Sequence, residues 1–145
     1  MNSTITRFGH PDSLVKEYEH WVVLLRPVQA TLGALILACK GEAKAFADIG
    51  PAAFAELGTA VADIERSLGN LFGYQKLNYL MLMMVDPHVH FHVLPRYEDA
   101  KRYAGAEFTD PGWPGPPNIG HVNEISSTQT SELLMKLRQT FSASE

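Results

Sequence analysis

Cysteine is nearly absent from this chain, because Cys39 is the only one among 145 residues. An intrachain disulfide is therefore impossible, and a reducing compartment is the simpler expectation. Long hydrophobic runs are missing as well. The longest, Leu35–Cys39 and Tyr79–Val85, fall far short of the roughly 20 residues that span a bilayer. The stretch from Met1 to Pro11 also lacks the apolar segment of a secretory signal. These absences predict a cytoplasmic protein with no membrane partner.

An excess of positive charge is lacking too. The chain has 12 Lys and Arg residues against 16 Asp and Glu residues, so its formal net charge is -4. Proteins that bind polymeric DNA or RNA usually carry a basic surface, whereas a small nucleotide needs only a local pocket. We therefore expect no nucleic acid polymer as a partner. The composition, 46% hydrophobic and 19% charged, is that of an ordinary globular protein.

The pattern of apolar residues predicts an α+β fold. Three strands are expected first, at Ser13–Tyr18, Trp21–Arg26 and Gly33–Lys40. A helix then begins at Pro51 and ends at Gly73, with apolar residues recurring three and four positions apart. Two more strands follow, and their order predicts an antiparallel five-stranded sheet covered by one main helix.

The fourth strand and the C-terminal region carry their own predictions. Leu77–Val85 is apolar at nearly every position, which predicts a central strand buried on both faces. Asp110–Gly120 is rich in proline and glycine and predicts an irregular wrap. A short closing helix is expected at Ser126–Phe141. We expect a single domain over residues 1–145, with the core in 1–110 and the wrap and last helix in 111–145.

The most informative stretch follows Asp86-Pro87, where His88, His90 and His92 occupy every second position. Alternate side chains of a strand share a face, so the three imidazoles are expected on one face and the apolar Val89, Phe91 and Val93 on the other. A lone histidine is more often a structural residue, and we interpret His10, His20 and His121 in that way. Three in register favour chemistry, because packing gains nothing from a row of imidazoles that each need a partner.

A neutral imidazole is a good nucleophile at pH 7 and a good leaving group from phosphorus. These properties suit transfer of a nucleotidyl group through a phosphoramidate intermediate. His90 alone has a neighbouring imidazole on both sides, so it is the natural nucleophile. The flanking histidines can hold its tautomer or donate hydrogen bonds to the phosphate and the leaving group.

The run His88-Val89-His90-Phe91-His92-Val93-Leu94 closely resembles the signature of the histidine triad (HIT) superfamily of nucleotide hydrolases and transferases. The resemblance implies a HIT-like fold, His90 as nucleophile, and His88 and His92 as supporting residues. It also implies dinucleoside polyphosphates or nucleoside phosphoramidates as substrates, a nucleoside monophosphate as product, no metal or other cofactor, and a homodimer. The ending Leu94-Pro95-Arg96 is more similar to the diadenosine polyphosphate hydrolase branch than to the phosphoramidase branch.

The chain departs from the family pattern at three places. Gly33 is followed by Ala34, where many members have a further histidine. Met83–Pro87 replaces the usual polar phosphate loop and is shorter. Arg26 stands where many relatives have asparagine, and a guanidinium there can bind phosphate and offset some of the lost polar contact. The competing interpretation of Arg26 is a solvated hairpin end.

Four residues are candidates for binding substrate, each with a structural alternative. They are Arg26, Asn78, Arg96 and Leu24. Arg96 has a competing role in pairing with Glu98 or Asp99. The structural alternative for Asn78 is a hydrogen bond within a buried strand. For Leu24 it is packing in the core.

Two other functions compete with hydrolysis. A pair of histidines two positions apart on a strand can chelate Zn²⁺, with Asp86 as a further ligand. A protein with a shortened phosphate loop can also bind or sense a nucleotide with little turnover.

Overall fold

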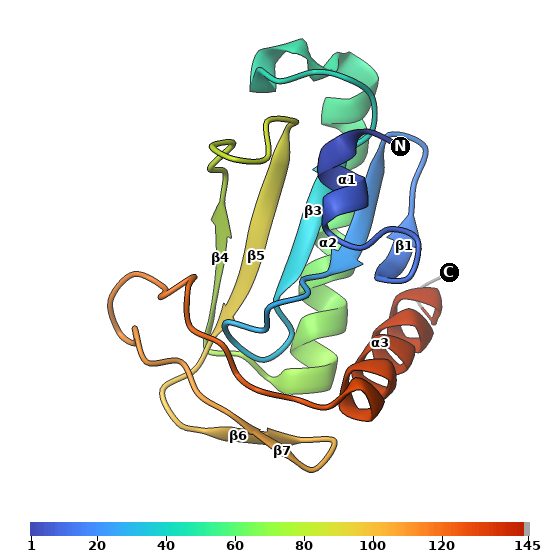
Figure 1. The fold of residues 1–145 in the computed structure, drawn as a ribbon. Coiled ribbons are helices and arrows are strands. Elements are labelled where there is room, and N and C mark those ends of the chain that lie inside the picture. The colour runs from blue at the N-terminus through green and yellow to red at the C-terminus, as the bar shows by residue number, and fades with distance from the viewer. Residues whose placement is uncertain (144–145) are drawn as a thin grey trace.

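The computed structural model describes residues 1–143 and contains a five-stranded antiparallel sheet with helices on both faces (Figure 1). The strands lie in the order β1-β2-β3-β5-β4. The predicted α+β class and five-stranded sheet are confirmed. The bounds of these strands are β1 Leu14–Glu17, β2 Trp21–Leu25, β3 Leu35–Cys39, β4 Lys76–Leu80 and β5 His90–Arg96.

The pairing register separates the side chains into two faces. Ile36 of β3 pairs with His92 of β5, and Ala38 pairs with His90, so these residues share one face. We call it the histidine face. The opposite face carries Val93, which is fully buried, and Phe91, which is half-buried. The predicted separation of histidines from apolar residues is therefore confirmed, although Phe91 is less buried than a central core residue.

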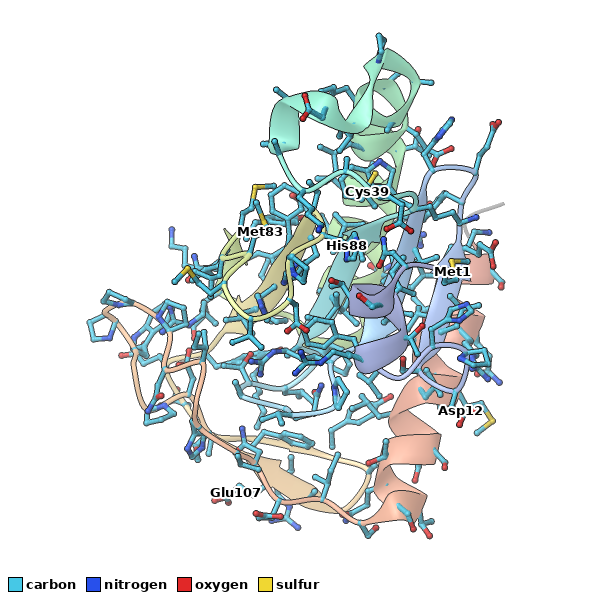
Figure 2. All side chains as sticks on the ribbon, turned by 45° about the horizontal axis from the view of Figure 1, so that its top comes forward. Met1, Asp12, Cys39, Met83, His88 and Glu107 are labelled. Carbon is cyan, nitrogen blue, oxygen red and sulfur yellow. The ribbon has the colours of Figure 1, made fainter. Side chains whose placement is uncertain are left out.

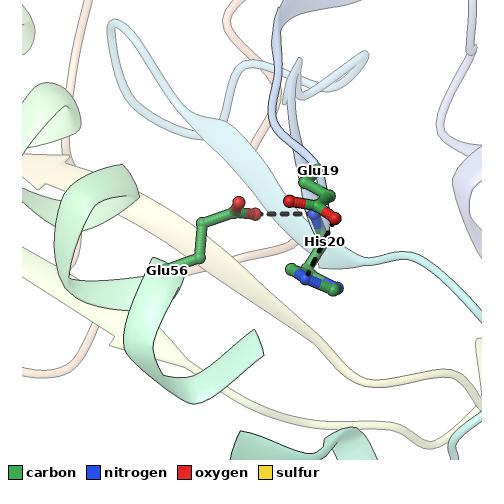
Figure 3. Close-up of side chains that lie close together, drawn as sticks. All are labelled: Glu19, His20 and Glu56. Carbon is green, nitrogen blue, oxygen red and sulfur yellow. Dashed lines mark hydrogen bonds and ion pairs between the residues drawn. The ribbon is translucent and has the colours of Figure 1, made fainter. Parts of the chain in front are cut away.

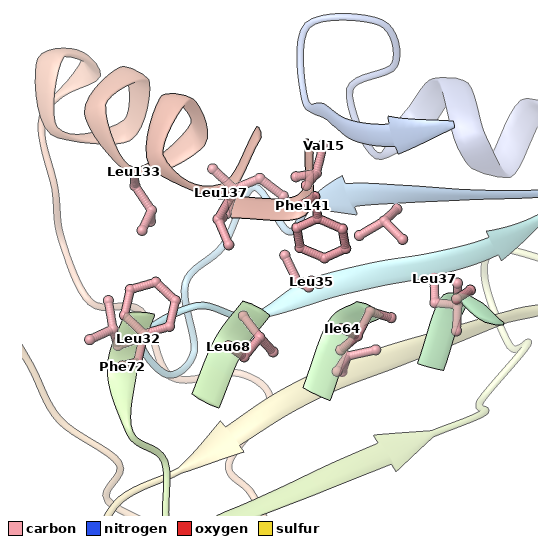
Figure 4. Packing of buried hydrophobic residues seen from close by; sticks show 14 of the residues in the cluster. Val15, Leu32, Leu35, Leu37, Ile64, Leu68, Phe72, Leu133, Leu137 and Phe141 are labelled. Atoms are coloured by element: carbon pink, nitrogen blue, oxygen red, sulfur yellow. The ribbon is translucent and has the colours of Figure 1, made fainter. Parts of the chain in front are cut away.

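Helix α2, Pro51–Phe72, covers the face opposite the histidines (Figure 1). Pro51 begins the helix, where a missing N–H costs nothing, and Gly73 ends it in a left-handed conformation at φ 59°. Its buried stripe includes Ile64 and Leu68, which pack toward the sheet residues Leu35 and Leu37 (Figure 4). This apolar layer gives the histidine strand a rigid support.

Helix α3, Ser127–Ser142, packs beside α2 on the same face (Figure 1). Ser126 caps it, and Gln129 returns a hydrogen bond to the backbone of Ser126, which forms a capping box. Leu133, Leu137 and Phe141 enter the core (Figure 4). The predicted closing helix is confirmed with a shift of one residue at each end.

The prediction for Leu77–Val85 is wrong in position and length. Strand β4 lies at the edge of the sheet, ends at Leu80 and is only half-buried beyond the exposed Lys76. The apolar residues after Leu80 instead form a loop, in which Met83 has a φ of 32° and Met84 is 85% exposed. Apolar character predicted burial here, but these side chains line a cavity.

Several elements have no counterpart in the predictions. Helix α1, Ser3–Arg7, lies over the histidine face and buries Ile5 against Leu24 and Ile36 (Figure 1). A second sheet joins β6, Lys101–Tyr103, to β7, Ala106–Phe108. A short 3₁₀ helix, η1, spans Phe46–Ile49. Among residues 1–143, no helix combines the length and apolarity that crossing a bilayer requires.

Candidate active site

His90, the first residue of β5, is 1% exposed and held in one tautomer by the backbone. Its Nδ1 lies 2.7 Å from the carbonyl oxygen of His88. A carbonyl oxygen only accepts hydrogen bonds, so Nδ1 carries the proton and donates it. The other ring nitrogen, Nε2, therefore keeps its lone pair in the neutral ring. A lone pair on Nε2 is what a nucleophilic imidazole requires.

His92 is held in the opposite tautomer. Arg26 Nε donates to His92 Nδ1 at 3.1 Å, and a guanidinium only donates, so Nδ1 is the acceptor. The proton of the neutral ring then lies on Nε2. Burial, the Arg26 charge and His90 together lower the pKa of His92 from 6.5 to about 4. The two rings, 5.2 Å apart between centroids, thus offer a lone pair and an N–H donor side by side.

The depressed pKa of His92 predicts a pH effect. Between pH 6.5 and 4 the unfolded chain binds a proton at this residue more readily than the folded protein, so stability falls as the pH drops through that window. In an NMR titration, we expect the His92 ring signals to stay those of neutral imidazole down to about pH 5. Arg26→Met should raise the pH at the midpoint of the His92 titration, because it removes the neighbouring positive charge. A wild-type midpoint near 6.5 would contradict this assignment.

Arg26 is buried, which rules out the solvated hairpin end. Besides His92, it donates from Nη1 to the carbonyl of Val28 and from Nη2 to the carbonyl of Ile119. It therefore ties β2 and β5 to the wrap, and each of its three nitrogens already has a protein acceptor. This geometry supports a role in orienting His92.

His88 precedes β5 and faces α1, with both ring nitrogens occupied. Thr4 Oγ1 lies 2.9 Å from its Nδ1 and also accepts from its backbone N–H at 3.2 Å. Nε2 lies 3.0 Å from the carboxylate of Glu42. Since the Glu42 carboxylate only accepts, Nε2–H donates to it, and Nδ1 of the neutral ring then accepts from the Thr4 hydroxyl. These contacts fix the peptide whose carbonyl orients His90.

A cavity of about 170 Å³ lies against His90 and His92. The rest of its lining comes from the loop before the triad, 82–86, which includes Met83 (Figure 2). Asp86 of this loop forms an ion pair with Arg7 of α1 at 3.2 Å. Phe8 packs against both rings, with centroids 5.6 Å from His90 and 5.8 Å from His92. The first eight residues and the loop therefore enclose the two imidazoles.

The remaining predicted binding residues lie away from this cavity. Leu24 is on the histidine face but is fully buried beneath α1. Arg96 and Asn78 line a second cavity farther along β5. Arg96 pairs with Asp110 at 2.7 Å, so the predicted pairing with Glu98 or Asp99 is wrong.

Thr4 and Glu42 were missed by the sequence analysis. They reach His88 across 84 and 46 positions of the chain, and no local spacing connects them to the triad. Only the placement of α1 over the histidine face brings Thr4 to His88.

One cluster of side chains on the described chain has the spacing of metal ligands. Within residues 1–143, three potential ligand atoms approach within 4.8 Å of one another only at Glu19, His20 and Glu56 (Figure 3). Glu56 there already accepts from the His20 backbone N–H at 2.6 Å, and the Glu19 side chain is 82% exposed. In the triad, the Arg26 charge beside His92 opposes a cation.

Comparisons with known proteins found solved structures of the same fold. A histidine triad protein from Marinobacter aquaeolei matches with a TM-score of 0.75 and 19% identity, over 99% of this chain and 96% of that chain. One from Bradyrhizobium japonicum matches with a TM-score of 0.74 and 19% identity, over 97% and 96%. A search of curated proteins found no match. The family model of the HIT domain matches residues 8–99. This match supports a role in nucleotide binding or hydrolysis, and it shows that the chain belongs to the HIT domain family.

Proposed function

We propose that this protein is a nucleotide hydrolase in which His90 attacks the α-phosphate of a dinucleoside polyphosphate or a nucleoside phosphoramidate. The observation that carries the proposal is the pair of tautomers set by the protein itself. The His88 carbonyl leaves a lone pair on His90 Nε2, and Arg26 leaves a proton on His92 Nε2. A nucleophile and a hydrogen-bond donor therefore stand together at one cavity.

The reaction has two displacements at phosphorus. In the first, His90 Nε2 forms a bond to the α-phosphorus, and the bond to the leaving group breaks with its electron pair. A dinucleoside polyphosphate releases a nucleotide anion, and a phosphoramidate releases an amine that takes a proton from solvent. The ring becomes positively charged, so its hydrogen bond from Nδ1 to the His88 carbonyl strengthens. His92 donates from Nε2 to a phosphate oxygen.

In the second displacement, water attacks the same phosphorus and the bond to His90 breaks. The ring regains its lone pair, the water loses a proton to solvent, and a nucleoside monophosphate is released. His88 acts through its carbonyl, because both of its ring nitrogens are already bonded to protein partners.

A second candidate function is nucleotide binding with little turnover. One observation favours it: Leu82, Met83, Met84 and Val85 line the triad cavity on the side of the shortened loop. These side chains supply no hydrogen-bond donors to a phosphate.

The deciding experiment measures release of AMP by chromatography in excess EDTA. The substrates are diadenosine tetraphosphate and adenosine 5′-phosphoramidate. We expect release from at least one of them to be unaffected by the chelator. Tight AMP binding with no release from either would favour the binding function, and release only after Zn²⁺ is restored would assign the triad to a metal site. The zinc control is included because a solved structure of similar fold is a Zn-bound histidine triad family protein from Mycobacterium smegmatis. It matches with a TM-score of 0.60 and 16% identity, over 90% of this chain and 84% of that chain.

The homodimer implied by the family resemblance stays a prediction. Strand β4 lies at the edge of the sheet, where a strand of a second copy can pair with it.

A further inference from the structure

A second cavity is separate from the triad. It measures about 420 Å³ and lies between β4, the end of β5 and the wrap that loops out beside them (Figure 1). We call it the Trp113 cavity. Its lining residues are Lys76, Asn78, Arg96, Trp113, Pro114, Gly115 and Pro116.

Arg96 is 3% exposed, and its guanidinium forms an ion pair with one carboxylate, that of Asp110. Its Nε donates to Asp110 Oδ2 at 2.7 Å and its Nη2 to Asp110 Oδ1 at 3.1 Å. The Asp110 side chain is completely buried and also accepts from the backbone N–H of Tyr97. Both carboxylate oxygens are thus bonded, and Asp110 is not part of the cavity lining.

Arg96 also determines what Asn78 presents. Arg96 Nη1 donates to Asn78 Oδ1 at 2.8 Å, which fixes the orientation of the amide. The amide oxygen is thereby used, and both hydrogens of Nδ2 have no partner among residues 1–143. A guanidinium has five N–H groups, so Arg96 keeps further donors after its bonds to Asp110 and Asn78.

Lys76 adds a cation at the mouth of the cavity. It is exposed, and within the described part of the chain no carboxylate pairs with it. Trp113 is half-buried and supplies an aromatic surface in the same wall. The polar side chains of the cavity thus present donors and positive charge, and its ring suits stacking with another flat ring.

The position of the cavity relates it to the triad. Lys76, Asn78, His92 and Arg96 all lie on the histidine face, and His92 and Arg96 are four residues apart on β5. At about 3.3 Å per residue the separation is about 13 Å. Leu80, Leu94 and Ile119 pack together between the two cavities.

We infer that the Trp113 cavity binds a nucleoside phosphate, with its base stacked on Trp113 and its phosphate near Lys76 and Asn78. Among anions that carry an aromatic ring, the choice of a nucleoside phosphate rests on the proposed function, in which the triad acts on the same class of compound. Two sources supply such a ligand: the leaving half of a dinucleoside polyphosphate, or a separate free nucleotide.

Binding is tested by tryptophan fluorescence with AMP as the probe. The chain has two tryptophans, and Trp21 is fully buried with its Nε1 bonded to the carbonyl of Ala53. Trp113 alone is placed to respond. We expect saturable quenching that disappears in Trp113→Phe and weakens about tenfold in Lys76→Ala, as loss of a charged contact predicts. Lys136→Ala on α3 removes the same charge elsewhere and should change nothing.

Turnover distinguishes the two sources. If the cavity holds the leaving half, Lys76→Ala should lower kcat/KM about tenfold for diadenosine tetraphosphate and leave adenosine 5′-phosphoramidate unchanged, since its leaving group is a simple amine. Weakened AMP binding with both activities intact identifies a separate nucleotide. Absence of quenching, or equal weakening in Lys76→Ala and Lys136→Ala, overturns the inference. Quenching without any turnover refutes the proposed hydrolase alone.

Discussion

Replacing His90 with alanine is expected to lower turnover by about 10⁴-fold or more, because the proposed covalent step has no other nucleophile. The measurement is AMP release from whichever substrate the wild-type protein hydrolyses, with single-turnover kinetics to detect residual chemistry. Thermal unfolding should show a stable fold, since among residues 1–143 the side chain forms a hydrogen bond only to the His88 carbonyl, and α2 packs on the opposite face.

The matched control is Phe91→Ala, one residue along the same strand. Phe91 packs against Trp21, Phe46 and Tyr79 on the opposite face. This variant should lose stability but retain catalytic chemistry at a temperature where it is folded, although the half-buried ring makes the loss smaller than the roughly 3–5 kcal/mol of a fully buried phenylalanine. Turnover in His90→Ala within tenfold of wild type would refute the nucleophilic role.

Replacing Asp110 with alanine is expected to cost about 3–5 kcal/mol of unfolding free energy, because it leaves the buried Arg96 guanidinium without its counter-ion. The Tyr97 N–H loses its acceptor in the same variant. Chemical denaturation gives the free energy directly. In a thermal melt the Tm should fall by roughly 10–15 °C.

A double variant separates the charge from the packing. Arg96→Met with Asp110→Asn removes both charges and keeps an acceptor for Tyr97, so it should recover much of the stability that Asp110→Ala loses. If Asp110→Ala and the double variant are equally unstable, the unpaired charge is not the cause of the loss.

The sequence predicted best those features that depend on local periodicity. Alternation with a period of two placed His90 and His92 on one face, and spacings of three and four with Pro51 and Gly73 placed α2. These patterns are read over a few neighbouring residues, and no knowledge of the tertiary fold is needed for them.

Predictions failed where the outcome depends on distant residues. The apolar run after Leu80 looked like a buried strand, because hydrophobicity does not distinguish a core from the wall of a cavity. The partner of Arg96 is Asp110, 14 residues away through β6 and β7, and not the nearby Glu98. Arg26 reaches Ile119 across 93 residues. No spacing in the sequence encodes such contacts.

The anchoring of His88 has a consequence for how the chain acquires its function. The bond from Thr4 joins the first helix to a residue 84 positions later, and Arg26 needs the wrap that follows β7. Closing loops of this length is slow compared with forming a helix or a hairpin. During synthesis, Thr4 can therefore meet His88 only after more than half of the chain has emerged. Recovery of the proposed hydrolase activity during refolding would then mark the completion of the whole molecule, later than the appearance of its secondary structure.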